Sequence, residues 1–134
     1  MITLIIGKKG SGKTKKLLDL CATATKNSNG NVVFLEKDKT LTYDLDHSTR
    51  LVALDEYGVN SFASLYGFLA GMCAGNYDIT DIFVDSTLKI AAEGLDGLEA
   101  FVENLSRLDV NIVLSVSADK ADIPARIAEY ATEI

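Results

Sequence analysis

The residues best suited to chemistry in this 134-residue chain lie near its beginning, in IIGKKGSGKTKK (5–16). This stretch matches the pattern G-x-x-x-x-G-K-[ST]. The glycines permit a tight turn whose backbone N–H groups converge on an anion, and a helix starting after the turn adds partial positive charge. Lys13 would then reach the outer phosphates of a polyphosphate, and the Thr14 hydroxyl would bind Mg²⁺. The candidate binding residues form one continuous loop: Gly7, Lys8, Lys9, Gly10, Ser11, Gly12, Lys13 and Thr14.

The residues on either side of this loop supply the structural context that the pattern requires. ITLII (2–6) is an apolar run typical of a buried strand, and residues 13–26 predict a helix with one apolar face. With this order of strand, loop and helix, the chain resembles the P-loop NTPase superfamily, whose core elements would cover nearly its whole length. The resemblance implies a nucleoside triphosphate with Mg²⁺ as ligand, a central parallel sheet, and a catalytic role for Lys13.

Motifs of particular subfamilies narrow the identity of the nucleotide. Guanine-specific members use an N-K-x-D element, and the nearest string, SADK (117–120), does not match it. The LSGGQ signature of ABC transporters is also missing. ATP is therefore the predicted nucleotide. The stretch YDITDIFVDS (77–86), followed by a helix and then NIVLSVSAD (111–119), resembles the second half of RecA-type and thymidine-kinase-like cores.

Two aspartates are candidates to complete the magnesium site, because P-loop NTPases usually hold the ion through an aspartate at the end of a second buried strand. Asp85 follows IFV (82–84), and Asp55 follows LVAL (51–54). By sequence alone LVALDE matches the metal-binding strand better, since hydrolytic members of the superfamily often place a glutamate directly after the aspartate. Context favours Asp85, because its strand lies between two predicted helices, whereas LVAL follows a predicted hairpin and is expected at the periphery of the sheet. Asp85 is the predicted metal partner, and Asp55 is the alternative.

The choice of Asp85 has a consequence for hydrolysis. Ser86 then occupies the position of the expected catalytic glutamate, and a serine hydroxyl is no general base near neutral pH without an activating neighbour. Glu56 becomes the first candidate for a carboxylate supplied from elsewhere, although a solvated strand end explains it equally well. Ser115 or Ser117 could contact the terminal phosphate, but turn formation is the commoner role of such residues.

The hydrophobic pattern along the chain alternates between the periods of strands and helices. This alternation predicts an α/β three-layer sandwich with a mainly parallel central sheet, formed by a single nucleotide-binding domain over residues 1–134. A small antiparallel hairpin over 31–45, with LTYDL (41–45) as its second strand, is expected at the sheet edge. The other predicted strands are 2–6, 31–35, 51–54, 82–84 and 111–116; the predicted helices are 13–26, 59–74, 95–108 and 122–130, the last with Asp122 as N-cap.

The predicted helix over 59–75 carries small residues every four positions: Ala63, Gly67, Gly71 and Gly75. A glycine inside a helix costs up to about 1 kcal/mol relative to alanine, so three of them require a compensating role. Close packing against the sheet or a neighbouring helix would supply one. The alternative is an interface with a second copy of the chain or with a protein partner.

Composition limits the remaining partners. The net charge is −6, and the main basic cluster belongs to the phosphate loop, so nucleic acid is not an expected partner. Cys21 and Cys73 fall on apolar helix positions and are expected to be reduced. The longest apolar stretch (62–75) is too short to cross a membrane, and the first residues do not resemble a signal peptide. A cytoplasmic location is predicted.

Together these features predict an ATP-binding protein with weak or partner-dependent ATPase activity, whose nucleotide state controls its assembly or regulation. The first alternative is a kinase acting on a nucleoside or another small molecule, although the chain has little length for a lid and an acceptor pocket. The second alternative is a degenerate P-loop subunit that does not turn nucleotide over.

Overall fold

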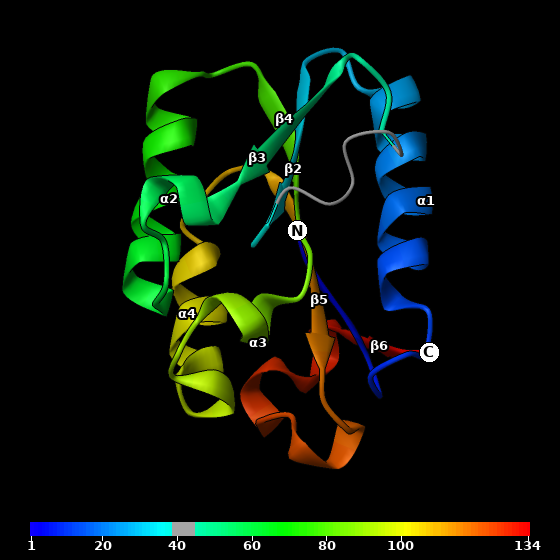
Figure 1. Cartoon of the computed structure of the whole chain (residues 1–134), viewed down its shortest axis with the longest axis vertical. Coiled ribbons are helices and arrows are strands. Elements are labelled where there is room, and N and C mark those ends of the chain that lie inside the picture. The colour runs from blue at the N-terminus through cyan, green and yellow to red at the C-terminus, as the bar shows by residue number, and fades with distance from the viewer. Residues whose placement is uncertain (39–44) are drawn as a thin grey trace.

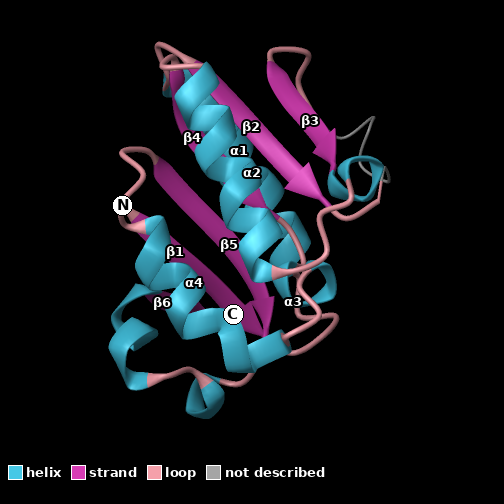
Figure 2. Ribbon diagram, turned by 90° about the vertical axis from the view of Figure 1, so that its left-hand side faces the viewer, coloured by secondary structure: helices cyan, strands magenta, loops and turns pink. Residues whose placement is uncertain are grey.

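The protein is built on one six-stranded sheet in which every pair of described strands runs parallel. A computed structural model describes residues 1–38 and 45–134 (Figure 1). The strand order is β3-β2-β4-β5-β1-β6, which Figure 2 shows across the sheet. The strands are β1 (Ile2–Gly7), β2 (Asn31–Glu36), β3 (Thr49–Ala53), β4 (Ile79–Val84), β5 (Asn111–Ser117) and β6 (Ala131–Glu133).

The central strands are apolar on both faces, as expected for a parallel sheet covered on each side. In β2, Val32 and Phe34 pack toward one face, while Val33 and Leu35 belong to the core of the other. In register, Phe34 lies beside Phe83 of β4, and their rings are stacked with centroids 6.4 Å apart. The sheet is therefore the middle layer between two cores.

Helices cover both faces of this sheet. α1 (Lys13–Asn27) packs Leu17 and Cys21 onto one face, whereas α2 (Phe62–Gly75) and α4 (Leu98–Leu105) cover the opposite face (Figure 1). Shorter helical segments lie at the ends of strands: α3 (Thr87–Ile90) and the 3₁₀ segments η1 (Leu54–Tyr57), η2 (Gly94–Gly97), η3 (Lys120–Asp122) and η4 (Ala125–Tyr130). None of the helices in the described ranges has the length and apolar character that a membrane span needs.

The predicted α/β class with a mainly parallel sheet is confirmed. The structure differs from the prediction mainly in the segments at the edges of the sheet. The second strand of the expected hairpin, 41–45, falls almost wholly outside the described residues, and β2 pairs with the parallel strands β3 and β4. The predicted strand 51–54 is β3, which begins at Thr49 and forms an edge of the sheet, as its predicted peripheral position required.

The prediction of a single α-helix over 122–130 is wrong, because this segment contains the end of one 3₁₀ helix and a second 3₁₀ helix. Asp122 ends η3 and caps nothing, and Pro124 is extended, so the next helical turn begins only at Ala125. That segment is a 3₁₀ helix with one buried side chain, Ile127. A run so short, following a proline without an N–H, has too small an apolar face to stabilise a longer α-helix. The predicted helix 95–108 is likewise shorter, because η2 precedes α4.

The glycines of α2 do not pack closely against the rest of the described chain. A Cβ atom added at Gly67, Gly71 or Gly75 would meet no heavy atom within 4 Å apart from the adjacent residues and the backbone of the same helix. The expectation that these glycines allow tight packing on the sheet or a neighbouring helix is therefore wrong. Instead, Phe62, Leu65 and Leu69 provide the buried face of α2.

Candidate functional site

The phosphate-loop motif forms the turn between β1 and α1. β1 ends at Gly7, and α1 begins at Lys13 after a turn in which the Ser11 N–H donates to the Lys8 carbonyl at 3.0 Å. Gly10 and Gly12 have φ values of 84° and 95°, a region that side chains disfavour. Gly12, the N-cap of α1, has no side chain, and no cap hydrogen bond is formed within the described residues. The first amide groups of α1 can therefore donate to a ligand, and a helix N-terminus favours an anion.

Lys13 is buried within this turn. Its Nζ donates to the Lys8 carbonyl at 2.7 Å and lies 3.5 Å from Ser11 Oγ. Burial lowers the pKa of the Lys13 ammonium, although the negative charge of Asp85 opposes the shift. A buried cation with few partners is costly, and an anion in the turn would offset that cost.

Thr14 and Asp85, 71 residues apart in the sequence, meet at the carboxyl ends of the strands. Thr14 Oγ1 donates to the Asp85 carboxylate, with distances of 3.0 and 3.2 Å to its two oxygens. Ser115 Oγ, from the neighbouring strand β5, donates to Asp85 Oδ1 at 2.7 Å. Asp85 is 8% exposed, so these hydroxyls stabilise a buried carboxylate and fix its orientation.

Thr14 and Asp85 both offer oxygen atoms, the ligand type that Mg²⁺ prefers. The Thr14 hydroxyl donates its proton to Asp85, which leaves its lone pairs for a metal ion. Protein-bound Mg²⁺ commonly takes one or two protein oxygens and completes its shell with water and phosphate oxygens. In the described ranges no three His, Cys, Asp or Glu side chains gather into a metal-binding group, so any ion here would depend on such additional ligands.

Ser86 turns the chain sharply after Asp85. It is the one described residue other than glycine with a positive φ, at 53° with ψ of 52°. Its N–H donates to Ser115 Oγ at 2.6 Å, which ties the turn to β5. Non-glycine residues in this conformation concentrate at sites where function requires the backbone geometry. The turn starts α3 directly beside the phosphate loop.

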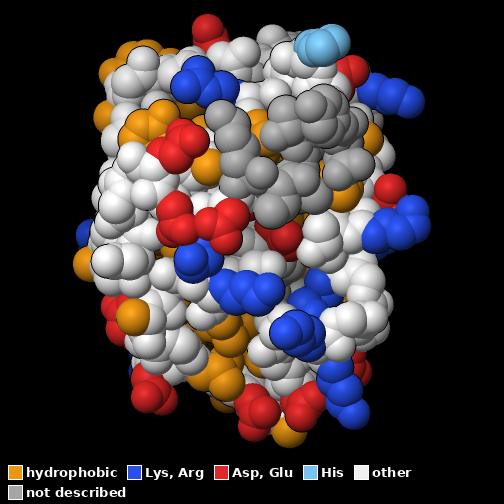
Figure 3. Space-filling view, in the orientation of Figure 1, with side chains coloured by type: hydrophobic (Ala, Val, Ile, Leu, Met, Phe, Trp, Pro, Cys, Tyr) orange, Lys and Arg blue, Asp and Glu red, His pale blue; other side chains and the backbone are white. Residues whose placement is uncertain are grey.

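Two cavities adjoin at this place. One, of about 490 Å³, is lined by loop residues and by the ends of β4 and β5, including Lys13 and Ser117. The other, of about 250 Å³, contains Asp85 and two further carboxylates, Glu36 and Asp38. Figure 3 shows acidic and basic side chains side by side in the middle of this face of the molecule. One cavity is therefore lined by the lysine-containing loop, and the other is lined by three carboxylates together with Lys37 and Lys89.

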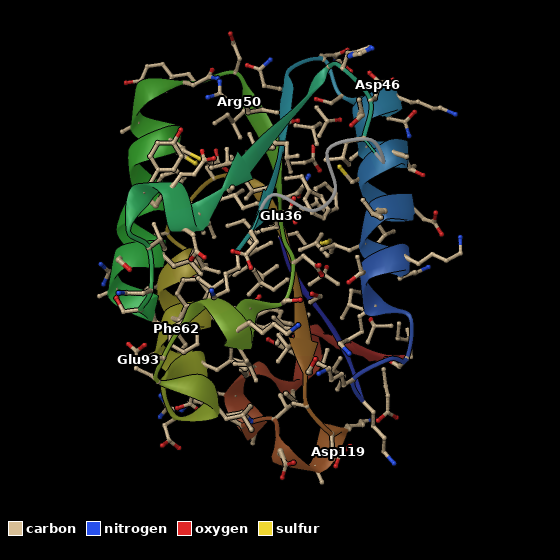
Figure 4. The ribbon with its side chains drawn as sticks, in the orientation of Figure 1. Glu36, Asp46, Arg50, Phe62, Glu93 and Asp119 are labelled. Carbon is tan, nitrogen blue, oxygen red and sulfur yellow. The ribbon has the colours of Figure 1, made fainter. Side chains whose placement is uncertain are left out.

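Glu36 is the residue that sequence reasoning missed. It ends β2, the strand beside β4, and is 4% exposed near the centre of the molecule (Figure 4). The Asp85 N–H donates to the Leu35 carbonyl at 2.9 Å, which keeps the two strand ends together. A signal was present in the sequence, because Glu36 follows the apolar run NVVFL (31–35) as Asp85 follows IFV.

Asp55 and Glu56 do not line the two cavities, although Asp55 contacts Lys37 and Asp38, which line the cavity of Asp85. Both belong to η1, after the edge strand β3. Asp55 Oδ2 is 3.1 Å from Lys37 Nζ. Hydrogen bonding to Asp38 and to Lys37 holds the pKa of the Asp55 carboxyl below its usual value. The structure thus brings Asp85, and not Asp55, to Thr14; the roles of these residues remain predictions.

No protein-family model matches the chain, and no curated protein is significantly similar to it. The fold and the site therefore define only a class: an α/β protein with a parallel sheet and a glycine-rich, lysine-containing loop at the carboxyl ends of its strands. In open α/β sheets this end of the strands is where ligands usually bind.

Proposed function

We propose that this protein is a P-loop nucleotide-binding protein that holds ATP with Mg²⁺ through the loop from Gly7 to Thr14. The observation that carries the proposal is the contact between Thr14 Oγ1 and Asp85 at 3.0 Å, beside the buried ammonium of Lys13. A hydroxyl, a carboxylate and a lysine around an open helix N-terminus form a set suited to a metal-bound polyphosphate. A bound Mg²⁺ would supply neutralisation of phosphate charge.

We further propose that hydrolysis of the bound ATP depends on Glu36. Ser86 cannot accept a proton at neutral pH, whereas the Glu36 carboxylate lines the cavity that contains Asp85. Glu36 would take a proton from a water molecule as the water oxygen bonds to the terminal phosphorus. The bond to the bridging oxygen would break, releasing a diphosphate and inorganic phosphate.

The binding claim is tested by calorimetry with ATP and Mg²⁺, comparing wild type with Lys13→Ala. Charged hydrogen bonds contribute about 1.5–3 kcal/mol, so affinity should fall by at least about tenfold in the variant. Lys26→Ala is the matched control, because Lys26 is exposed at the other end of α1 and should bind ATP as wild type does. GTP should bind more weakly than ATP. A wild type that binds neither nucleotide measurably would remove the proposal.

We also propose that bound nucleotide controls the assembly of this protein with a partner or with a second copy. This part rests on the exposed small-residue face of α2, where the described chain leaves Gly67, Gly71 and Gly75 without close neighbours. An interface with a partner or a second copy would use that space. The sedimentation of the purified protein with and without ATP measures self-association. Release of ADP that requires a nucleoside or small alcohol would instead favour the kinase alternative.

A further inference from the structure

Lys89 occupies a special position between the two cavities. Three residues line both of them: Thr14, Ser86 and Lys89. Thr14 belongs to the phosphate loop, and Ser86 is the left-handed turn after Asp85. Of the three, only Lys89 carries a charge. A cation therefore lies where the phosphate cavity meets the carboxylate cavity.

The local fold fixes Lys89 in this place. The left-handed Ser86 turns the chain out of β4 into α3, and the Lys89 N–H donates to the Ser86 carbonyl at 2.9 Å. On the same short helix, Thr87 and Ile90 are fully or almost fully buried, which anchors α3 to the core and leaves Lys89 exposed. Lys89 is thus an exposed side chain on a helix that is fixed to the core.

The Lys89 ammonium forms no hydrogen bond or ion pair within the described residues. In residues 1–38 and 45–134, no carboxylate forms an ion pair with Lys89, although Glu36, Asp38 and Asp85 line the same cavity. These carboxylates provide a negative field that favours a cation nearby. A lysine without a fixed partner remains available to a ligand.

The junction of the two cavities is also where the end of a polyphosphate chain would lie. The loop amides and Lys13 surround one part of the chain, and Thr14 with Asp85 marks the position of the metal ion. If Glu36 activates the attacking water, as proposed above, the terminal phosphate would face the cavity that Glu36 lines. A diphosphate would not extend to this point.

We infer that Lys89 binds the terminal phosphate of a nucleoside triphosphate and thereby distinguishes it from the diphosphate. This inference rests on the proposed nucleotide-binding function and adds the side chain that would contact the third phosphate. Lysine suits this role because its ammonium is a compact point charge on a flexible stem, and hydrogen bonds between ions are about twice as strong as neutral ones.

The test compares wild type, Lys89→Ala and Lys89→Arg in calorimetry with Mg²⁺ and either ADP or a non-hydrolysable ATP analogue. In Lys89→Ala, affinity for the analogue should fall about tenfold, while affinity for ADP changes less than about twofold. Lys89→Arg, which keeps the charge, should retain most of the preference for the triphosphate. Lys26→Ala is the matched control for loss of an exposed lysine and should leave both affinities unchanged.

The outcomes separate this inference from the function on which it rests. If wild type binds neither nucleotide, the proposed function fails. If wild type binds both and Lys89→Ala weakens them equally or not at all, nucleotide binding stands and the role of Lys89 is overturned. Thermal unfolding of each variant checks that it is folded, and Lys89→Gln, which keeps most of the aliphatic stem, replaces the alanine variant if that one is not.

Discussion

At the scale of single residues, the groups around Asp85 differ in what they can do with a proton. The Thr14 and Ser115 hydroxyls already donate to Asp85 and are poor bases. Asp38 lines the cavity that contains Asp85 but is exposed to solvent. Glu36 is buried at the same cavity, at the end of the strand beside β4. It is therefore the carboxylate best placed to act as the base.

Substituting Glu36 and Glu56 separately tests which of them supports hydrolysis. Glu36→Gln keeps the size of the side chain and removes its basicity, so ATP turnover should fall by at least about 100-fold, the usual range for loss of a general base. ATP affinity should change little. Glu56→Gln is the matched control, because Glu56 lies in η1 and does not line the cavities beside Thr14. Phosphate release under saturating ATP measures both variants; a larger loss in Glu56→Gln would reverse the assignment.

The contact between Thr14 and Asp85 could be predicted from the sequence, but the position of Glu36 could not. Both partners of the contact stand at strand ends in a recognisable order of elements, and carboxyl ends of parallel strands meet at one edge. The identity of the strand next to β4 depends on sheet order, which local sequence does not encode. The string LVALDE therefore drew attention to Glu56, whereas strand pairing puts β2 and Glu36 beside Asp85.

At the scale of elements, α2 is well capped at its first turn but carries exposed glycines further along. Ser61 and Ser64 form a reciprocal capping box, and the Phe62 N–H donates to both oxygens of the Glu93 carboxylate at 3.2 Å (Figure 4). The exposed glycines in its interior contribute nothing to packing within the described chain. The helix is thus held at its first turn and on its buried face.

Replacing the interior glycines of α2 with alanine should stabilise the isolated protein. Because a Cβ at Gly67 or Gly71 meets open space, each substitution should raise the free energy of unfolding by about 0.5–1 kcal/mol through helix propensity. Gly97→Ala is the contrasting variant, since its Cβ would lie 2.5 Å from Phe62 Cδ2 in the core and should destabilise the protein. Urea unfolding measures all three. A loss of stability in Gly67→Ala would show that this space is used within the molecule.

Elements with a strong periodic pattern were predicted well, and those defined by tertiary contacts were not. α1, α2 and the four strands β1, β2, β4 and β5 follow from apolar runs that end in glycine or polar residues. β6 has only three residues and owes its conformation to pairing with β1, so the sequence gives no strand signal. Similarly, α3 has four residues and depends on the left-handed Ser86 before it.

At the scale of the whole molecule, the strand that carries the phosphate loop depends on the end of the described chain. β1 pairs only with β5 and β6 in the described sheet, and its register brings Ile2 beside Ile112. Contacts between such distant segments slow folding, because the long loop between them must close first. We therefore expect the loop between β1 and α1 to need β5 and β6 for its stable conformation.

A fragment of residues 1–110 should consequently fail to fold cooperatively. It lacks β5 and β6, so β1 would have no neighbouring strand, and the buried residues Leu4 and Ile6 would lose Leu114 and Val116 of the core. A fragment of residues 1–130 is the matched control, because it keeps β5 beside β1 and should unfold cooperatively at a lower urea concentration than the full chain. Circular dichroism during urea unfolding follows all three proteins. A sigmoidal transition in the shorter fragment would contradict this dependence, since it would show that the remaining strands and helices form a stable core without β5 and β6.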